Sequence, residues 1–316
     1  MLLNRRNLLA SSLALAACGQ ETAKPATTLR VAYYRGQAET WMAAAGLPEL
    51  PFRVVKSPFA SGNLIVEAIS AGALDLGSMS DIPPVFVAQK QSPVRLVAVL
   101  EGDVANQVVL VPKTSPIKVI GDLKGKRIGY VRATTSHYIL LRILDEIGLT
   151  FADITPVALA PQDGRAAFER GDLDAWVIFG VVGFLAREAT GARILTNGVG
   201  RLTGNYAFAA AQSALDDPPK RAAVAAWLRR VRDTYAWSEA HPDEAIRLVA
   251  SDTGLPEAVY RGQRAQRTTA PNLIPPSDAA IVSQQMVADT FFKAGILPAR
   301  VDVAPLWVRD FDYGTA

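Results

Sequence analysis

Short strand-like runs alternate with apolar helical patterns along most of this chain. A short apolar run bounded by turn residues favours a strand, whereas apolar residues three and four positions apart favour a helix. In the first hundred residues the pattern predicts strands over 29–34, 52–56, 74–78 and 94–100, and helices over 63–71 and 82–89. Such alternation favours an α/β fold with a mostly parallel sheet flanked by helices.

A second unit repeats this plan. It predicts strands over 127–131, 154–158 and 173–179, and helices over 136–147 and 165–170. The segments EAISAGALD (67–75) and AAFERGDLD (166–174) both end a predicted helix at a glycine and enter a strand after Leu-Asp. Glycine suits a left-handed helix cap. The likeness therefore fits two related lobes, and it fits two ordinary loops equally well.

The last third of the chain is mainly helical. Residues 206–212 predict one more strand, and the longest helical patterns cover 221–241 and 278–294. One lobe inserted into another explains why the central segment is self-contained while these helices have no sheet of their own. We therefore predict that residues 29–110 and 207–316 form lobe 1, that residues 111–206 form lobe 2, and that two crossover strands join them.

The first 18 residues have the features of an export signal. Arg5 and Arg6 give a positive start, residues 8–17 are apolar but too short to span a bilayer, and small residues precede Cys18. The tetrapeptide LAAC resembles a bacterial lipobox, which would make Cys18 a lipid anchor; an ordinary secretory signal is the alternative. The arginine pair fits the twin-arginine or the general export route. Polar residues 19–28 predict a short tether.

The charge of the chain argues against a nucleic-acid partner. Its formal charge is +3, and it falls to +1 when Arg5 and Arg6 are removed with the signal. Arg229, Arg230 and Arg232 alternate with apolar residues, as on the solvated face of a helix, and no basic cluster is interleaved with aromatic residues. With 50% hydrophobic and 20% charged residues, the chain should be a compact globular protein. We expect a monomer.

Three hydroxyl residues and a histidine stand where a predicted strand meets a predicted helix. In VRATTSHYILL (131–141), Thr134, Thr135 and Ser136 occupy the start of the helix and His137 its first turn. Free backbone N–H groups and the helix dipole favour an anion at such a position. The alternative is that the hydroxyls only cap the helix and that His137 packs against the loop.

Two further strand-to-helix corners carry small polar residues. Ser61, Gly62 and Asn63 precede the helix of the first unit, and Ser80 and Asp81 lead into a segment that begins with two prolines. Ligands of open α/β sheets bind beyond the carboxyl ends of the strands, where such corners meet. The three corners together predict a donor-rich site for a small oxyanion.

Four stretches resemble the aliphatic sulfonate-binding proteins of bacterial ABC importers. They are GALDLGSMSDIPPVFVAQ (72–89), LVPKTSPIKVIGDLKGKRI (110–128), SHYILLRILDEIGLTFADITPV (136–157) and RAAFERGDLDAWVIF (165–179). Related members of that superfamily take up taurine, nitrate or thiamine-precursor pyrimidines. The resemblance covers residues 29–214. It implies a two-lobe periplasmic-binding-protein fold of type II, which closes on an anionic ligand and delivers it to a membrane permease.

The family's site pattern is kept only in part. Its Gly-Ser-x-x-His motif falls on residues 133–137, where alanine replaces the glycine, and its acidic, proline-rich corner falls on residues 80–84. Where relatives carry Trp-Asp-Pro, this chain has Phe179 followed by glycine and valine, so the implied site loses a carboxylate. Asp163, or the acid of the 80–84 corner, could replace that charge. Gln37, near the exit of the first strand, is a further candidate contact.

Enzymatic interpretations lack the residues that they need. A desulfinase of the same superfamily uses a cysteine nucleophile, and the only cysteine here is Cys18. Two histidines are too few for a zinc site, and no hydrolase, P-loop or dinucleotide motif is complete. We expect no enzyme, metal or cofactor.

The sequence therefore predicts a lipid-anchored receptor on the periplasmic side of the cell envelope. Its ligand would be an organic sulfonate, and its partner an ABC permease in the inner membrane. The alternatives are another small solute, such as taurine, nitrate or a thiamine-precursor pyrimidine, and a scaffolding or sensing lipoprotein.

Overall fold

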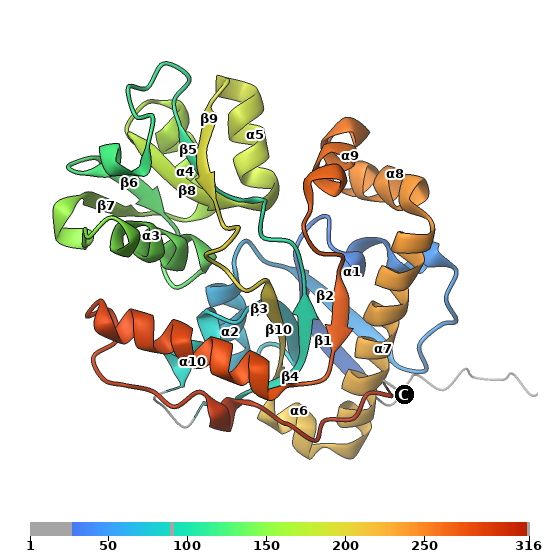
Figure 1. The fold of residues 1–316 in the computed structure, drawn as a ribbon. Helices are drawn as coiled ribbons and strands as arrows, with labels where there is room; N and C mark the ends of the chain where they lie inside the picture. Colours follow the sequence, from blue (N-terminus) through green and yellow to red (C-terminus); the bar gives the residue numbers. More distant parts are fainter. Residues whose placement is uncertain (1–26, 89–91, 315–316) are drawn as a thin grey trace, which may run out of the picture.

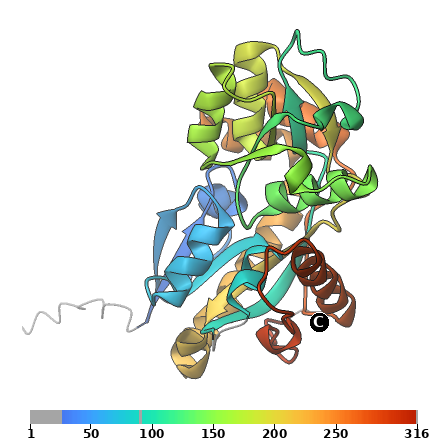
Figure 2. The ribbon, with the colours of Figure 1, turned by 90° about the vertical axis from the view of Figure 1, so that its left-hand side faces the viewer.

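The computed structural model describes residues 27–88 and 92–314, which form two lobes with one sheet in each (Figure 1). The predicted signal peptide, Cys18 and residues 19–26 of the predicted tether lie outside the described residues. Residues 102–106 and 198–204 link strands of different sheets and so connect the lobes. Figure 2 shows the two lobes stacked one above the other.

The sheet of the first lobe has six strands in the order β11-β4-β10-β3-β1-β2. They are β1 (Thr28–Tyr33), β2 (Arg53–Pro58), β3 (Leu76–Ser80), β4 (Val94–Glu101), β10 (Asn205–Ala211) and β11 (Asn272–Ile274). β1 pairs in parallel with β2 and β3, whereas β10 lies antiparallel between β3 and β4. β10 runs in the opposite direction because it returns from the other lobe.

The sheet of the second lobe has five strands in the order β7-β6-β8-β5-β9. They are β5 (Gln107–Val111), β6 (Arg127–Tyr130), β7 (Thr155–Ala158), β8 (Ala175–Phe179) and β9 (Arg193–Asn197). β6 pairs in parallel with β7 and β8, and β5, which arrives from the first lobe, is antiparallel to β8 and β9. Both sheets are thus mixed: most strands share one direction, and β10 and β11 in the first sheet and β5 in the second run against them.

Helices cover both faces of each sheet. The α-helices are α1 (Ala38–Trp41), α2 (Gly62–Ser70), α3 (Thr135–Glu146), α4 (Pro161–Glu169), α5 (Gly180–Thr190), α6 (Gln212–Asp216), α7 (Pro218–Ala240), α8 (Pro242–Thr253), α9 (Glu257–Gln266) and α10 (Asp278–Lys293). The 3₁₀ helices are η1 (Met42–Ala45), η2 (Pro83–Val87), η3 (Ile120–Leu123), η4 (Phe151–Asp153) and η5 (Ala304–Leu306). In the first lobe, α2 and α10 bury apolar residues on one face of the sheet and α7 on the other; in the second lobe, α3 covers one face and α4 and α5 the other.

Most predicted elements are confirmed, and the departures have physical causes. The helix predicted over 82–89 is the short 3₁₀ helix η2, which begins with Pro83 and Pro84; short connecting segments commonly take this form. β5 and β9 were not predicted; β5 is buried along its whole length and carries no alternating pattern. Among the described residues, none of the helices combines the length and apolar character that crossing a bilayer requires.

The two segments noted for their likeness make the same interaction in both lobes. In the first lobe, Asp75 accepts hydrogen bonds from the backbone N–H and the guanidinium of Arg30, and Arg30 also donates to the carbonyl of Gly72. In the second lobe, Asp174 and Arg127 repeat each of these bonds, with Gly171 in the place of Gly72. Both glycines have positive φ. The repeated Gly-x-Leu-Asp pattern therefore marks a structural repeat.

Candidate ligand-binding site

A cleft of about 750 Å³ separates the two lobes. Its first-lobe wall comes from the residues after β1, the start of α2, β3 and the helices α7 to α9. Its second-lobe wall comes from the starts of α3, α4 and α5. The volume is within the range of small-molecule sites, and the position beyond the carboxyl ends of parallel strands is where ligands of such sheets bind.

Four α-helices begin at this cleft. The first residues of α2, α3, α4 and α5 are Gly62, Thr135, Pro161 and Gly180, and all four line it. Within the described chain, none of the four N-cap side chains accepts a hydrogen bond from its helix. Pro161 has no N–H and the N–H of Gly180 donates to the carbonyl of Asn106 at 3.2 Å, whereas the remaining first-turn N–H groups are left to a ligand. The positive ends of four helix dipoles converge on one space.

Glycine at position 62 lets α2 begin close to the first-lobe wall. A Cβ atom there would lie 2.8 Å from Cβ of Met79 and 3.0 Å from Cγ of Pro83, so a larger residue would have to push the wall apart. The Oη atom of Tyr34 would lie 3.3 Å from the same Cβ. The start of α2 and the Tyr34 hydroxyl therefore stand side by side at the cleft.

Polar side chains supply the remaining contacts. Arg35 is the one cationic side chain that lines the cleft in the described chain. Its Nη2 donates a 2.7 Å hydrogen bond to the carbonyl of Asp252. Gln37 accepts a 3.3 Å hydrogen bond from Ser78, which orients its amide. The carboxylate of Asp103 is already engaged by the backbone and hydroxyl of Thr268. Glu101, the second carboxylate of the cleft, accepts a hydrogen bond from Asn272 at 2.9 Å. The cleft thus offers a cation and an amide to an anion, while both of its carboxylates accept hydrogen bonds from the protein.

Burial shifts the pKa values of three groups at the first-lobe wall. Burial raises the pKa of Glu39 to about 7, although its own backbone N–H and Lys56 oppose this, and its Oε2 has no partner in the described residues. Burial also raises the pKa of Tyr34 and of Tyr235, and the charge of Glu39 adds to both shifts. The tyrosines of this wall therefore act as neutral hydroxyl and ring surfaces.

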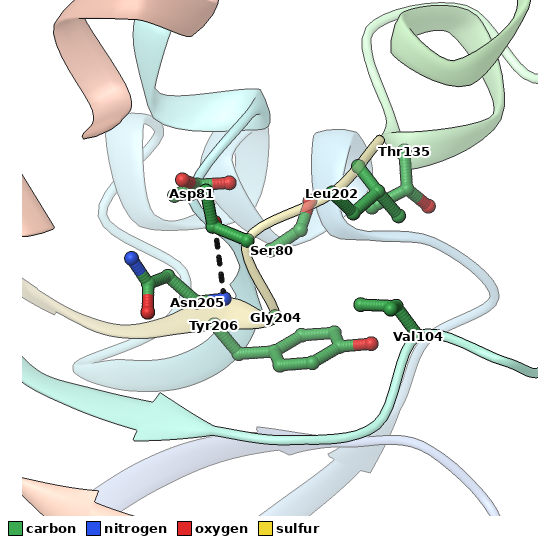
Figure 3. A pocket seen from close by; sticks show the side chains of 9 residues that line it. Ser80, Asp81, Val104, Thr135, Leu202, Gly204, Asn205 and Tyr206 are labelled. Carbon is green, nitrogen blue, oxygen red and sulfur yellow. Dashed lines mark hydrogen bonds between the residues drawn. The ribbon is translucent and has the colours of Figure 1, made fainter. Parts of the chain in front are cut away.

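A void of about 10 Å³ adjoins the cleft beside the two linking segments (Figure 3). Ser80, Thr135 and Tyr206 line both spaces. Asp81 lines only the void: its backbone N–H donates to Asn205 at 3.4 Å, and its buried Oδ2 has no partner among the described residues. Burial raises the pKa of Asp81 to about 7. The volume is close to that of one water molecule.

The hydroxyls that begin α3 serve the protein itself. Thr134 Oγ1 donates to the carbonyl of Val131 at 2.7 Å, and Thr135 Oγ1 donates to Gln107 at 2.6 Å. Ser136 Oγ donates to Val177 at 2.6 Å and accepts from Val131 at 3.0 Å, which ties α3 to β8 and to the end of β6. Thr134 and Thr135 line the cleft, whereas Ser136 lies behind it.

His137 is part of the apolar interior. It is 1% exposed, and its ring packs against Tyr130, Phe151 and Phe291. Its Nδ1 accepts the N–H of Ala133 at 3.3 Å, and its Nε2 has no partner in the described chain. Burial, aided by the charge of Arg132, lowers the pKa of His137 to about 3. The histidine is neutral and does not line the cleft.

The other predicted contacts divide into two groups. Those that line the cleft are Gln37, Gly62, Ser80 and Phe179. Ser61 is the buried N-cap of α2, and Asn63 is the second residue of that helix. Both belong to the helix start by their backbone, but neither residue lines the cleft. Asp163 is exposed in the first turn of α4, and the neighbouring Gln162 lines the cleft instead.

Several cleft residues were not foreseen from the sequence. Tyr34 and Arg35 directly follow β1, so the rule that placed Gln37 could have found them. Tyr235, Tyr260 and Gln263 come from α7 and α9, and no local pattern relates these helices to the strand ends of either sheet.

Ala133 adopts a φ of 57°, and it is the one residue other than glycine with positive φ in the described chain. This is the position where the resembling family carries glycine. A left-handed conformation costs an alanine about 1 kcal/mol, so we expect Ala133→Gly to raise the free energy of unfolding by up to ~1 kcal/mol in urea titrations. Ala71→Gly, at a right-handed helix end, is the matched control and should lower it. If both substitutions lower the free energy of unfolding, the left-handed backbone at Ala133 is not strained.

Fold and cleft together define the class of protein. Two sheets of the order 2-1-3, each completed by a strand from the other lobe, enclose a cleft toward which helix starts point. This is the architecture of two-lobed periplasmic binding proteins. A family model described as "NMT1/THI5 like" matches residues 31–245, and the chain belongs to this family.

Individual relatives agree with the family. A putative aliphatic sulfonates-binding protein of Escherichia coli (strain K12) is 32% identical over 283 residues, which cover 87% of this chain and 86% of the relative. The crystal structure of the periplasmic aliphatic sulphonate binding protein of Escherichia coli matches with a TM-score of 0.77 at 30% identity, covering 88% and 96% of the two chains. The alkanesulfonate-binding protein of Xanthomonas axonopodis pv. citri, bound to MOPS, matches with a TM-score of 0.81 at 31% identity, covering 89% and 97%. These similarities support a solute-binding role.

Proposed function

We propose that this protein captures an organic sulfonate outside the cytoplasm and delivers it to an ABC importer. The observation that carries the proposal is the convergence of four uncapped helix starts on one cleft. Three sulfonate oxygens can each accept hydrogen bonds from first-turn N–H groups and from the Gln37 amide, and Arg35 supplies a full positive charge. The named relatives bind sulfonates, which agrees with this chemistry.

Capture and release follow from how the anion is held. Helix dipoles share the neutralisation of its charge with Arg35, whose guanidinium also donates to the carbonyl of Asp252, so the ligand does not depend on one strong ion pair. Closure of the two lobes about residues 102–106 and 198–204 would bring the N-termini of α2 and α3 toward the ligand and exclude water. A permease would then recognise the closed form.

The anchor, the compartment and the absence of catalysis belong to the same proposal. An export signal ending at Cys18 would leave the folded body lipid-anchored at the periplasmic face of the envelope. The body beyond Cys18 has no cysteine, so it has no thiol nucleophile for a desulfinase reaction. The neutral, buried His137 is 1% exposed and cannot act as a base on a ligand in the cleft.

A thermal-unfolding panel tests the ligand class. We expect alkyl and aryl sulfonates, at about 100 times their Kd, to stabilise the purified protein by about 2.7 kcal/mol. Taurine, sulfate, nitrate and a pyrimidine are measured in parallel. Arg35→Gln should weaken the sulfonate effect, whereas Arg170→Gln, which changes an exposed arginine paired with Asp172 outside the cleft, should leave it intact.

Each other pattern in the panel has a definite meaning. Stabilisation by nitrate or by the pyrimidine alone would keep the receptor and overturn the sulfonate. No stabilisation by any compound would favour a scaffolding or sensing lipoprotein.

A further inference from the structure

The second-lobe wall of the cleft is apolar where α5 begins. Val181, Val182 and Leu185 line the cleft, directly after Phe179 at the end of β8. Positions 181 and 185, and positions 182 and 185, are neighbours on a helix surface. The first turns of α5 therefore present one continuous apolar stripe to the ligand space.

Two of the three residues of this stripe are not part of the core of the lobe. The inner face of α5 consists of Gly183 and Ala186, which are buried; a Cβ atom on Gly183 would lie 2.9 Å from Cγ2 of Ile178. Among the described residues, Val181 and Leu185 belong to neither apolar cluster of the second lobe. α5 thus has two apolar faces; on the face toward the cleft Val182 also packs against the core, whereas Val181 and Leu185 belong to no apolar cluster of the lobe.

Aromatic side chains stand across the cleft from this stripe. Tyr235 and Tyr260, from α7 and α9, line the first-lobe side, and Figure 1 shows α8 and α9 facing α5 across the gap between the lobes. Burial makes the Tyr235 ring a neutral surface, since it raises the pKa of the phenol. An apolar stripe opposed by tyrosine rings suits a flat, bulky hydrocarbon group.

The size of the cleft agrees with such a group. A bare oxyanion or a two-carbon sulfonate would fill a small part of about 750 Å³ and would leave Val181 and Leu185 in contact with water. We propose that the ligand is a sulfonate with a bulky apolar tail, of at least naphthalene size, and that the start of α5 selects this tail. This inference rests on the proposed sulfonate-binding function and names the substrate class of the same site.

Calorimetric titration of the purified protein compares methanesulfonate with naphthalene-2-sulfonate. Each buried CH₂-sized group adds roughly 0.8 kcal/mol, so we expect the naphthalene compound to bind at least tenfold more tightly. Equal affinities, or tighter binding of methanesulfonate, would overturn the selection by α5 and leave the sulfonate receptor standing. Binding of neither compound would instead contradict the proposed function.

A single substitution locates the tail. Leu185→Ala should weaken naphthalene-2-sulfonate binding about tenfold and change methanesulfonate binding less than twofold, because it removes apolar contact without touching a helix start. Met286→Ala, on α10 and 55% exposed outside the cleft, is the matched control and should change neither. If Leu185→Ala is folded by circular dichroism and both affinities stay as in the wild type, the tail does not lie on α5 and the inference fails.

Discussion

Replacing Asp75 by alanine should lower the free energy of unfolding by about 3 kcal/mol. The side chain of Asp75 is fully buried, and it accepts hydrogen bonds from the backbone and guanidinium of Arg30 and from Lys220 of α7. Burial alone would raise its pKa, but these bonds hold the pKa below its usual range. The substitution removes the group that joins β1, β3 and α7. Urea unfolding followed by circular dichroism measures the loss.

The second lobe supplies the control. Asp174→Ala breaks the same set of bonds to Arg127, but the Asp174 side chain is 34% exposed and that of Arg127 48%. Water can replace the lost bonds there, so we expect a loss of about 1 kcal/mol or less. Equal losses at both sites would show that burial does not set the strength of this repeated interaction.

The sequence predicts those parts of the fold that depend on local patterns. Alternation of strands and helices located β1 to β4, α2, α3 and the two-lobe plan, because these elements carry local apolar patterns bounded by turn residues. α5 was missed as a helix because its sequence, GVVGFLAREAT, is apolar on the cleft side as well as on the core side. The apolar stripe that made the helical pattern hard to recognise is the same stripe that we propose contacts the tail of the ligand.

The sequence located strand-to-helix corners that meet at the cleft, but it did not separate the side chains that line the cleft from those that do not. The helix start at Thr135 was found, but successive helical residues are turned by about 100°. Thr134 and Thr135 consequently face the cleft, while Ser136 and His137 point into the lobe. Which of them faces the ligand depends on how α3 packs on its sheet, and the local sequence does not contain that information.

His137 should lower the stability of the protein in mild acid, in opposition to Glu39 and Asp81, whose raised pKa values of about 7 favour the folded state over the same pH range. The pKa of His137 is about 3 in the folded state and about 6.5 in the unfolded state. As the pH falls below 6.5, the unfolded chain therefore binds a proton that the folded chain does not bind. Between pH 7.5 and pH 5 this single group should lower the free energy of unfolding by about 2 kcal/mol, and by about 3 kcal/mol at pH 4. His137→Asn, which keeps an acceptor near the Ala133 N–H, should remove that slope.

The test compares how the free energy of unfolding changes with pH, and not its value at one pH. His137→Asn also loses ring contacts with Tyr130, Phe151 and Phe291, so we expect it to be less stable than the wild type at pH 7.5 and closer to it at pH 5. His241→Asn, at the exposed second histidine of the chain, should keep the wild-type slope. If the free energy of unfolding changes with pH in the same way in all three proteins, His137 takes up its proton without unfolding, and the buried, neutral state assigned to it is wrong.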